Sequence, residues 1–190
     1  MDRTKTKPCP VSRAGLLLAG ALAAGAAAPA AADDLFLRLE GIQGESMDAR
    51  HKGEIGILSY TQSFTGPFAH SAPGAGAGAG KTTCGPVTVT KFIDVSSPQL
   101  ILFAANGQHI PRALITFRRS GQAQLEYYKV TLDDVIITEV EQTGSSAAAA
   151  RAMEKVSLIG RRFSFEYVSQ MPDGRRGGTP KAGWDCVANK

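Results

Sequence analysis

The pattern of apolar and polar positions from Asp33 onward has a period of two, which predicts β-strands. In LFLRLE (35–40), every second residue is leucine, as in a strand with one buried face. The same alternation predicts strands at the following segments: 54–64, 87–93, 113–120, 124–140, 155–160 and 161–170. A short turn separates 113–120 from 124–140, which is typical of a hairpin. A last short strand is expected near the C-terminus.

One helix is predicted, between Ser96 and Gly107. The serines at 96 and 97 supply an N-cap, Pro98 suits the first turn, and the glycine can end the helix. Because many strands accompany this single helix, the chain is predicted to be mainly β, a barrel or sandwich and not an alternating α/β protein.

Two long segments carry no clear periodicity. Residues 65–81 are dominated by Gly, Ala and Pro, and residues 142–153 contain an alanine run that is compatible with a helical turn. A long loop without secondary structure in a compact domain usually serves function or contact with another chain. Residues 65–81 are therefore the first candidate for a contact site.

The first 32 residues have the three-part layout of a secretory signal peptide. A basic start precedes the apolar segment GLLLAGALAAGAAA, and small residues after Pro29 place the cleavage site after Ala32. The alternative is an uncleaved membrane anchor, but a segment rich in alanine and glycine partitions weakly into lipid. We therefore predict a signal peptide at 1–32 and one mature domain at 33–190. The mature domain is expected to be periplasmic or secreted, without membrane contact after cleavage.

The predicted leader also carries much of the positive charge. Four of the 21 basic side chains and one acidic side chain lie in it, so its removal lowers the formal charge from +4 to +1. A nearly neutral chain lacks the basic footprint that nucleic-acid binding requires, so no nucleic-acid partner is predicted. The arginine pairs at 118–119, 161–162 and 175–176 are interpreted as solvated edges and turns.

Two cysteines, Cys84 and Cys186, remain in the mature chain, because Cys9 lies in the leader. An even number of cysteines in an oxidising compartment predicts a disulfide. Two buried free thiols, or a bond between chains, are the alternatives.

The stretch GAGAGAGKTT (74–83) matches a relaxed phosphate-loop pattern. A phosphate loop must join a buried strand to a helix whose first N–H groups hold the phosphate. The neighbouring residues favour neither element, because no strand pattern leads into the stretch and a GlyPro pair with β-branched alternation follows it. The sequence therefore predicts no nucleotide site.

Other catalytic chemistry is equally unsupported by the sequence. His51, His70 and His109 are scattered without the spacing that metal sites favour, and no nucleophile motif is present. The sequence predicts no catalytic residue, no metal site and no cofactor, and hence no enzyme.

The order and spacing of several segments resemble the Hcp (haemolysin-coregulated protein) family, whose members form the tubes of bacterial type VI secretion systems. The resemblance covers about Leu35 to Asp185. Its most specific segments are GIQGES (41–46), KFIDVSSPQL (91–100) and GlyTrp (183–184), and none of them is catalytic.

The resemblance implies a small β-barrel of two antiparallel sheets with one short α-helix, assembled as a hexameric ring. Rings of this family stack into tubes, bind effector proteins in the lumen and are themselves secreted. By position, the family's loop to a neighbouring subunit or ring is 65–81 here. Its contact candidates are Gly66, Gly74, Gly76, Gly78, Gly80 and Lys81. Small side chains would let this loop lie close to a neighbour's backbone.

The signal peptide departs from the family pattern, because tube-forming members are loaded from the cytoplasm without one. The sequence therefore favours a non-enzymatic Hcp-like ring or tube subunit that is exported by the general secretory route. Its expected partners are copies of itself, effectors or other type VI components. The alternative is a monomeric periplasmic barrel that binds proteins and has lost assembly.

Overall fold

The computed structural model describes residues 33–66, 81–120, 124–146, 150–171 and 175–190, so the predicted signal peptide lies outside the described residues. All described elements belong to the unit that begins at Ala31. Their order along the chain is β1 (Asp33–Leu39), β2 (Ile55–Ile57), β3 (Ser59–Thr61), β4 (Phe64–Thr65), β5 (Thr83–Cys84), β6 (Val87–Phe92), α1 (Ser97–Asn106), β7 (Ile110–Arg119), β8 (Glu126–Thr143), β9 (Met153–Tyr167) and β10 (Lys181–Asp185).

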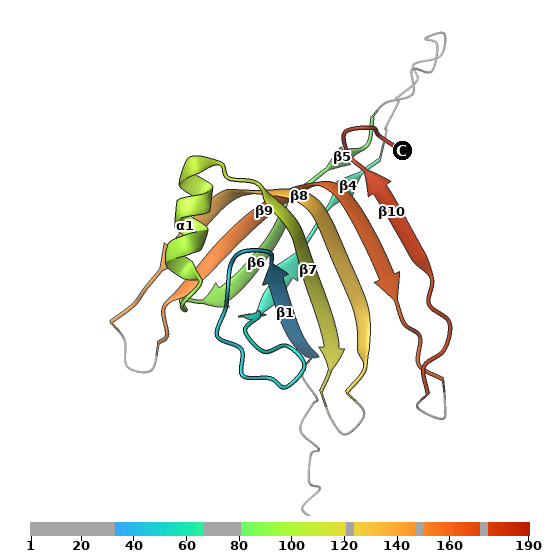
Figure 1. The fold of residues 1–190 in the computed structure, drawn as a ribbon, viewed down its shortest axis with the longest axis horizontal. Coiled ribbons are helices and arrows are strands. Elements are labelled where there is room, and N and C mark those ends of the chain that lie inside the picture. Colours follow the sequence, from blue (N-terminus) through green and yellow to red (C-terminus); the bar gives the residue numbers. More distant parts are fainter. Residues whose placement is uncertain (1–32, 67–80, 121–123, 147–149, 172–174) are drawn as a thin grey trace, which may run out of the picture. The chain divides into compact units, whose positions relative to one another are not determined.

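The main sheet has eight strands, and its pairings are antiparallel. The strand order is β2-β1-β7-β8-β9-β6-β3, and β10 pairs with β9 beside this path. Because only Leu58 separates β2 from β3, one continuous segment joins the two ends of the sheet. The sheet is therefore a nearly closed barrel (Figure 1), and a second sheet consists of β4 and β5 alone. The predicted fold class, mainly β with one short helix, is confirmed.

Two strand predictions were wrong in their continuity. The segment 54–64 is not one strand, because it changes partner along its length: β2 pairs with β1, β3 with β6, and β4 with β5. Conversely, 155–160 and 161–170 are one strand, β9, whose residues pair with β8 throughout and with β6 and then β10 on the other side. Local alternation gives the buried face of a strand but not its partner.

The alanine-containing loop is shorter than predicted, since β8 extends to Thr143 and β9 begins at Met153. The described residues between these strands, 144–146 and 150–152, form no helix, and residues 147–149 lie outside the description.

Side chains fill the interior of the barrel. The apolar residues without any exposed surface are Leu37, Ile55, Val87, Val89, Leu100, Ile110, Ala113, Ile115, Val130, Leu132, Val135, Val156 and Leu158. The helix α1 packs against β8 and buries Leu100 and Phe103. It ends at Gly107, whose φ of 65° is the left-handed conformation that glycine adopts without strain. The predicted helix is confirmed in its position.

Candidate assembly surfaces

The two-stranded sheet forms the base of the long loop predicted as a contact site. We call residues 66–81 the arm and the ribbon of β4 and β5 the arm base. In the arm base, Phe64 lies opposite Cys84, and Thr65 lies opposite Thr83. The Phe64 ring packs edge-on against Phe163, with 5.2 Å between ring centroids. The arm base is therefore seated on β9 by one aromatic side chain.

The predicted contact residues fall into two groups. Gly66 and Lys81, the two ends of the arm, are described, and both are exposed. The remaining candidates lie outside the described residues: Gly74, Gly76, Gly78 and Gly80. A contact role for these six residues stays a prediction. The residues after Lys81 form the strands β5 and β6. The helix that a phosphate loop requires does not follow the glycine-rich stretch, as the sequence predicted.

The structure contains the predicted disulfide within one chain. Cys84 of β5 is bonded to Cys186, which follows β10, with 6.1 Å between the Cα atoms. The Thr82 backbone N–H also donates a hydrogen bond to the Asn189 side-chain oxygen, at 3.1 Å. The arm base is thus tied to the C-terminal residues by one covalent bond and one hydrogen bond.

The C-terminal residues that receive this bond form a tight turn. The Asp185 backbone N–H donates to the Lys190 carbonyl at 2.8 Å, and the Asp185 carboxylate accepts from the N–H groups of Val187 and Ala188. The Cys186 N–H donates to the Arg161 carbonyl on β9 at 2.9 Å. This turn is therefore fixed to the barrel independently of the disulfide.

The GIQGES segment has a structural role, because it begins a loop that covers the outer face of β1. A Cβ atom at Gly44 would lie 2.4 Å from the Glu54 carbonyl oxygen, so only glycine fits there. The loop encloses Arg118, which is 3% exposed and donates to the carboxylates of Asp34 at 2.9 Å and Asp48 at 2.7 Å. The hydrogen bond from Arg118 holds the pKa of Asp48 well below its usual range. The interpretation of Arg118 as a solvated edge residue was wrong, since the covering loop buries it.

His51 fastens the same loop to the barrel. It is 5% exposed and stacks on Phe36 of β1, with 4.0 Å between ring centroids. Its Nδ1 lies 2.9 Å from a Glu54 carboxylate oxygen, and its Nε2 lies 3.7 Å from Glu126 of β8. Local sequence pattern does not predict this packing, because Phe36 and Glu126 lie in other elements.

The KFIDVSSPQL segment contributes a buried network of four charged and polar side chains. Lys91 Nζ donates to Asp94 at 2.8 Å and to Glu154 of β9 at 2.6 Å, and neither Lys91 nor Glu154 has any exposed side-chain surface. Ser97 Oγ donates to the same Glu154 oxygen at 2.6 Å. We call Lys91, Asp94, Ser97 and Glu154 the buried network. It joins β6, the start of α1 and β9.

The buried network also corrects the predicted helix cap. Ser96 makes no side-chain capping bond; its N–H and hydroxyl both donate to the Asp94 carboxylate, at 2.8 and 2.5 Å. Burial raises the pKa of Asp94, but hydrogen bonds from Lys91 and Ser96 outweigh burial, so this pKa lies below its usual value. Burial likewise raises the pKa of Glu154, and bonds from Gln142, Lys91 and Ser97 reverse the shift. Both carboxylates are therefore stabilised in their charged form.

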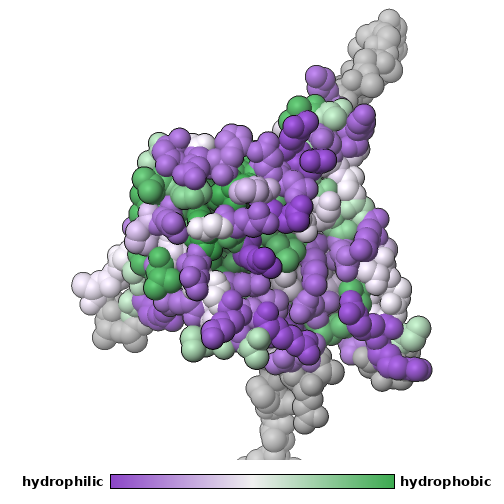
Figure 2. Space-filling model, in the orientation of Figure 1, coloured by the Kyte–Doolittle hydropathy of each residue, from purple (hydrophilic) through white to green (hydrophobic). Residues whose placement is uncertain are grey.

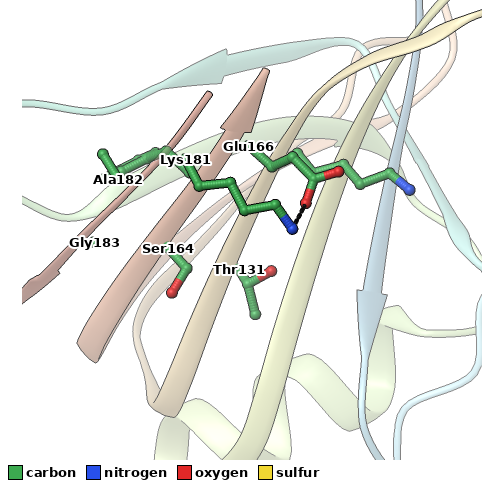
Figure 3. A pocket seen from close by; sticks show the side chains of 8 residues that line it. Thr131, Ser164, Glu166, Lys181, Ala182 and Gly183 are labelled. Carbon is green, nitrogen blue, oxygen red and sulfur yellow. Dashed lines mark ion pairs between the residues drawn. The ribbon is translucent and has the colours of Figure 1, made fainter. Parts of the chain in front are cut away.

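A polar face lies across β8, β9 and β10, where three rows of residues are in register: Lys129–Glu166–Lys181, Thr131–Ser164–Gly183 and Asp133–Arg162–Asp185. Figure 3 shows Lys181 and Glu166 pointing toward each other from adjacent strands, and their charged atoms are 2.7 Å apart. The hydrogen bond from Lys181 lowers the pKa of Glu166. A depression of ≈ 460 Å³ lies over the first two rows, and its lining includes Lys129, Thr131, Ser164, Glu166, Lys181 and Gly183.

Among the described strands, β10 pairs only with β9, so its second edge is open. An open edge can receive a strand from another chain. The GlyTrp pair lies in this strand: Gly183 pairs with Ser164 and Trp184 with Phe163.

Apolar surface gathers where α1 lies. Figure 2 shows apolar side chains at the left, in the region where Figure 1 draws α1. The exposed apolar residues of α1 and of the segment before it include Val95, Ile101 and Leu102, which are 63%, 43% and 57% exposed. This surface is more apolar than the charged face across β8, β9 and β10.

The described ranges contain neither a cluster of metal-ligating side chains nor a candidate membrane-spanning helix. No group of three or more His, Cys, Asp or Glu side chains is arranged there to hold a metal ion. The described part of the chain also contains no helix with the length and apolar character to span a bilayer.

Comparison with known proteins identifies the family. Residues 36–167 match the family described as "Type VI secretion system effector, Hcp". The Hcp1 protein of Pseudomonas aeruginosa is 34% identical over 158 residues, which cover 82% of this chain and 96% of that protein. This chain belongs to the Hcp family.

Solved structures of Hcp proteins share the fold. Hcp1 from Salmonella typhimurium has a TM-score of 0.70 and 36% identity, covering 84% of this chain and 98% of that one. A type VI secretion system effector from Yersinia pestis has a TM-score of 0.64 and 28% identity, covering 80% and 99%. The Hcp resemblance that the sequence motifs indicated is therefore confirmed.

The geometry explains why the Hcp motifs were recognisable without catalytic residues. GIQGES and KFIDVSSPQL carry the close backbone approach at Gly44 and the buried charge of Lys91. Both features tolerate few other residue types, so these two segments have structural roles in the barrel.

Proposed function

We propose that this chain is a non-enzymatic subunit that assembles into Hcp-type rings, after export by the general secretory route. In this proposal the leader at 1–32 is removed, and the mature protein acts in the periplasm or outside the cell. Its partners are further copies of itself and effector-type proteins bound in the ring lumen.

The observation that carries the proposal is the anchored arm base. The arm begins at Gly66 and ends at Lys81, next to a ribbon that is covalently bonded to the C-terminal turn. Eight residues in each direction allow a reach of at most roughly 26–29 Å, since an extended chain spans about 3.3–3.6 Å per residue. An arm of this length, fixed at its base, can contact a neighbouring copy.

The packed interior of the barrel supports a binding space that several subunits enclose together, and not one inside a single subunit. Apolar side chains without exposed surface fill the barrel, so one subunit has no internal space for a protein partner. In a ring, the subunits together would enclose the space for an effector. The open edge of β10 offers a further element for pairing with a neighbouring copy.

The test is the mass of the assembled protein. The complete gene is expressed in a Gram-negative host, the protein is recovered from the periplasmic fraction, and its N-terminus is sequenced. Native mass spectrometry should then show a species of about six subunits, each beginning at or near Asp33. A monomer at all accessible concentrations would contradict the ring and favour a monomeric binding module.

A variant tests the arm directly. Replacement of residues 67–80 by a short Gly-Ser turn should shift the assembled species toward the monomer while the barrel remains folded. The matched control replaces Ala147, Ala148 and Ala149 with serine, which changes a different loop. Equal assembly of the two variants would show that the arm makes no subunit contact.

A further inference from the structure

We infer that the Cys84–Cys186 disulfide controls assembly, so that the subunits associate when the bond is formed and separate when it is reduced. The inference rests on the proposed function, because it concerns the base of the arm through which copies make contact. It adds a redox switch to that contact.

The other contacts that hold the arm base are weak. The ribbon has two residue pairs and extends the β3–β6 pairing, which ends at Thr61 and Thr88. Beyond that root no third strand of the described residues pairs with it, so the ribbon is less stable than the main sheet. Its aromatic anchor, Phe64, is 39% exposed. The Phe64 ring also lies 5.8 Å from the Phe165 ring, and among the described residues hydrogen bonds join Thr82 to Asn189 and Gly85 to Ser63. Without the disulfide, the end of the ribbon far from β3 and β6 would be held by these few contacts alone.

Cys186, at the other end of the disulfide, is held more firmly than the arm base. Cys186 follows β10 directly, and its backbone N–H is bonded to Arg161 of the central strand β9. The turn behind it is closed by bonds between Asp185 and Lys190 in both directions, at 2.8 and 3.4 Å. The disulfide thus joins a weakly held ribbon to a firmly held turn, and its reduction should release the ribbon alone.

Release of the arm base should weaken the association between subunits. A contact made by a loosely held segment requires that the segment be ordered on binding, which lowers the affinity. A base that is already fixed removes part of that cost. Oxidised subunits should therefore assemble at lower concentrations than reduced subunits.

The chemistry of the switch is thiol–disulfide exchange. On oxidation, the two thiols lose two protons and two electrons to an external disulfide, which is reduced to two thiols; a dithiol reverses the reaction. A reducing compartment keeps the cysteines as thiols, and an oxidising compartment favours the bond. Export through the predicted leader would therefore confine assembly to the oxidising compartment outside the cytoplasm.

The experiment compares redox states of the full gene product. Protein recovered from the periplasm is studied by sedimentation velocity over a concentration series, in oxidised glutathione and in dithiothreitol. Far-UV circular dichroism and hydrogen exchange are measured on the same samples. The matched control is the variant Cys84→Ser with Cys186→Ser, whose assembly should not respond to the reductant.

The expected result is a concentration for half-assembly that rises about tenfold or more on reduction, with the double variant equal to the reduced protein. The far-UV spectrum should be unchanged, and faster exchange should be confined to residues 62–66, 81–85 and 185–190. Equal assembly in both redox states would overturn the switch and leave the ring intact. No assembly in either state would overturn both the ring and the switch. Loss of the barrel on reduction would also overturn the switch, because the bond would then hold the fold and not the arm base.

Discussion

The arm base and the buried network attach peripheral elements to the same strand, β9, by opposite means. The buried network holds α1 through a lysine and a glutamate that are fully enclosed and joined at 2.6 Å. The arm base is held through a half-exposed disulfide, one aromatic ring and a few hydrogen bonds. The first attachment cannot be undone without exposing or orphaning a buried charge. The second can be undone by a two-electron reduction at the surface.

This difference separates a part of the molecule that must stay fixed from a part that can be switched. A buried ion pair adds little net stability compared with apolar residues, but removal of one partner is costly. A disulfide acts mainly on the unfolded or opened state and is reversible under biological redox conditions. Four measurements test this difference between the two attachments.

The largest effect is expected for Lys91→Ala, which leaves Glu154 charged and buried without its ion partner. The free energy of unfolding should fall by about 3–5 kcal/mol, measured by urea denaturation. The control is Lys91→Met with Glu154→Leu, which removes both charges and should recover much of the loss. A loss below about 1 kcal/mol for Lys91→Ala would show that the network is not closed to water.

The next effect is that of the disulfide. Its two cysteines are 102 residues apart, and removal of a native disulfide that closes so long a loop should lower the free energy of unfolding by about 2–4 kcal/mol. Denaturation of the oxidised and reduced protein measures the difference. Intact mass under non-reducing conditions should be about 2 Da lower than after reduction. An unchanged mass would show two free thiols instead.

A fall in pH should weaken the stabilisation by the buried network but not the stabilisation by the disulfide. The pKa values of Asp94 and Glu154 are lowered from 3.8 and 4.5 in the folded protein. Their contribution is therefore complete above those unfolded values and is lost as the pH falls through the lower folded values. Stability should therefore fall through this network as the pH is lowered below about 5, which urea denaturation over a pH series measures.

The control for acid sensitivity is again the variant with Lys91→Met and Glu154→Leu, in which this part of the pH dependence should be reduced. The stability difference between oxidised and reduced protein should stay constant over the same range, because thiols do not titrate there. A redox difference that changed with pH as steeply as the network would contradict the separation of the two regions.

The smallest effect is expected for Phe64→Ala, which removes the aromatic contact beneath the arm base. The oxidised protein should lose about 0.5–1 kcal/mol, because the partly exposed ring contacts Phe163 and Phe165, at 5.2 and 5.8 Å between centroids. Hydrogen exchange at β4 and β5 should respond more strongly in the reduced protein, where the disulfide no longer holds the ribbon. Phe64→Leu serves as the control, since it keeps the apolar contact but removes the ring.

The sequence predicted features that depend on local pattern. Leu35, Leu37 and Leu39 gave β1, and the stretch from Ser97 to Gly107 gave the helix and its end. The cysteine count pointed to the pair that is bonded in the structure. Each of these features is set by residues that are adjacent, periodic or few in number.

The missed features depend on partners far away in the sequence. Lys91 was treated as part of a strand pattern, but Glu154, 63 residues later, makes it a buried ion. Arg118 was assigned to the surface, although Asp48, 70 residues earlier, closes over it. The division of 54–64 among three partners arises from closure of the barrel and leaves no mark on local alternation.

Native mass spectrometry of the periplasmic protein, before and after reduction, measures assembly and its redox control together. A six-subunit species is expected in the oxidised sample and should give way to monomer in dithiothreitol at the same concentration. An oxidised protein that remains monomeric at every concentration would rule out the ring.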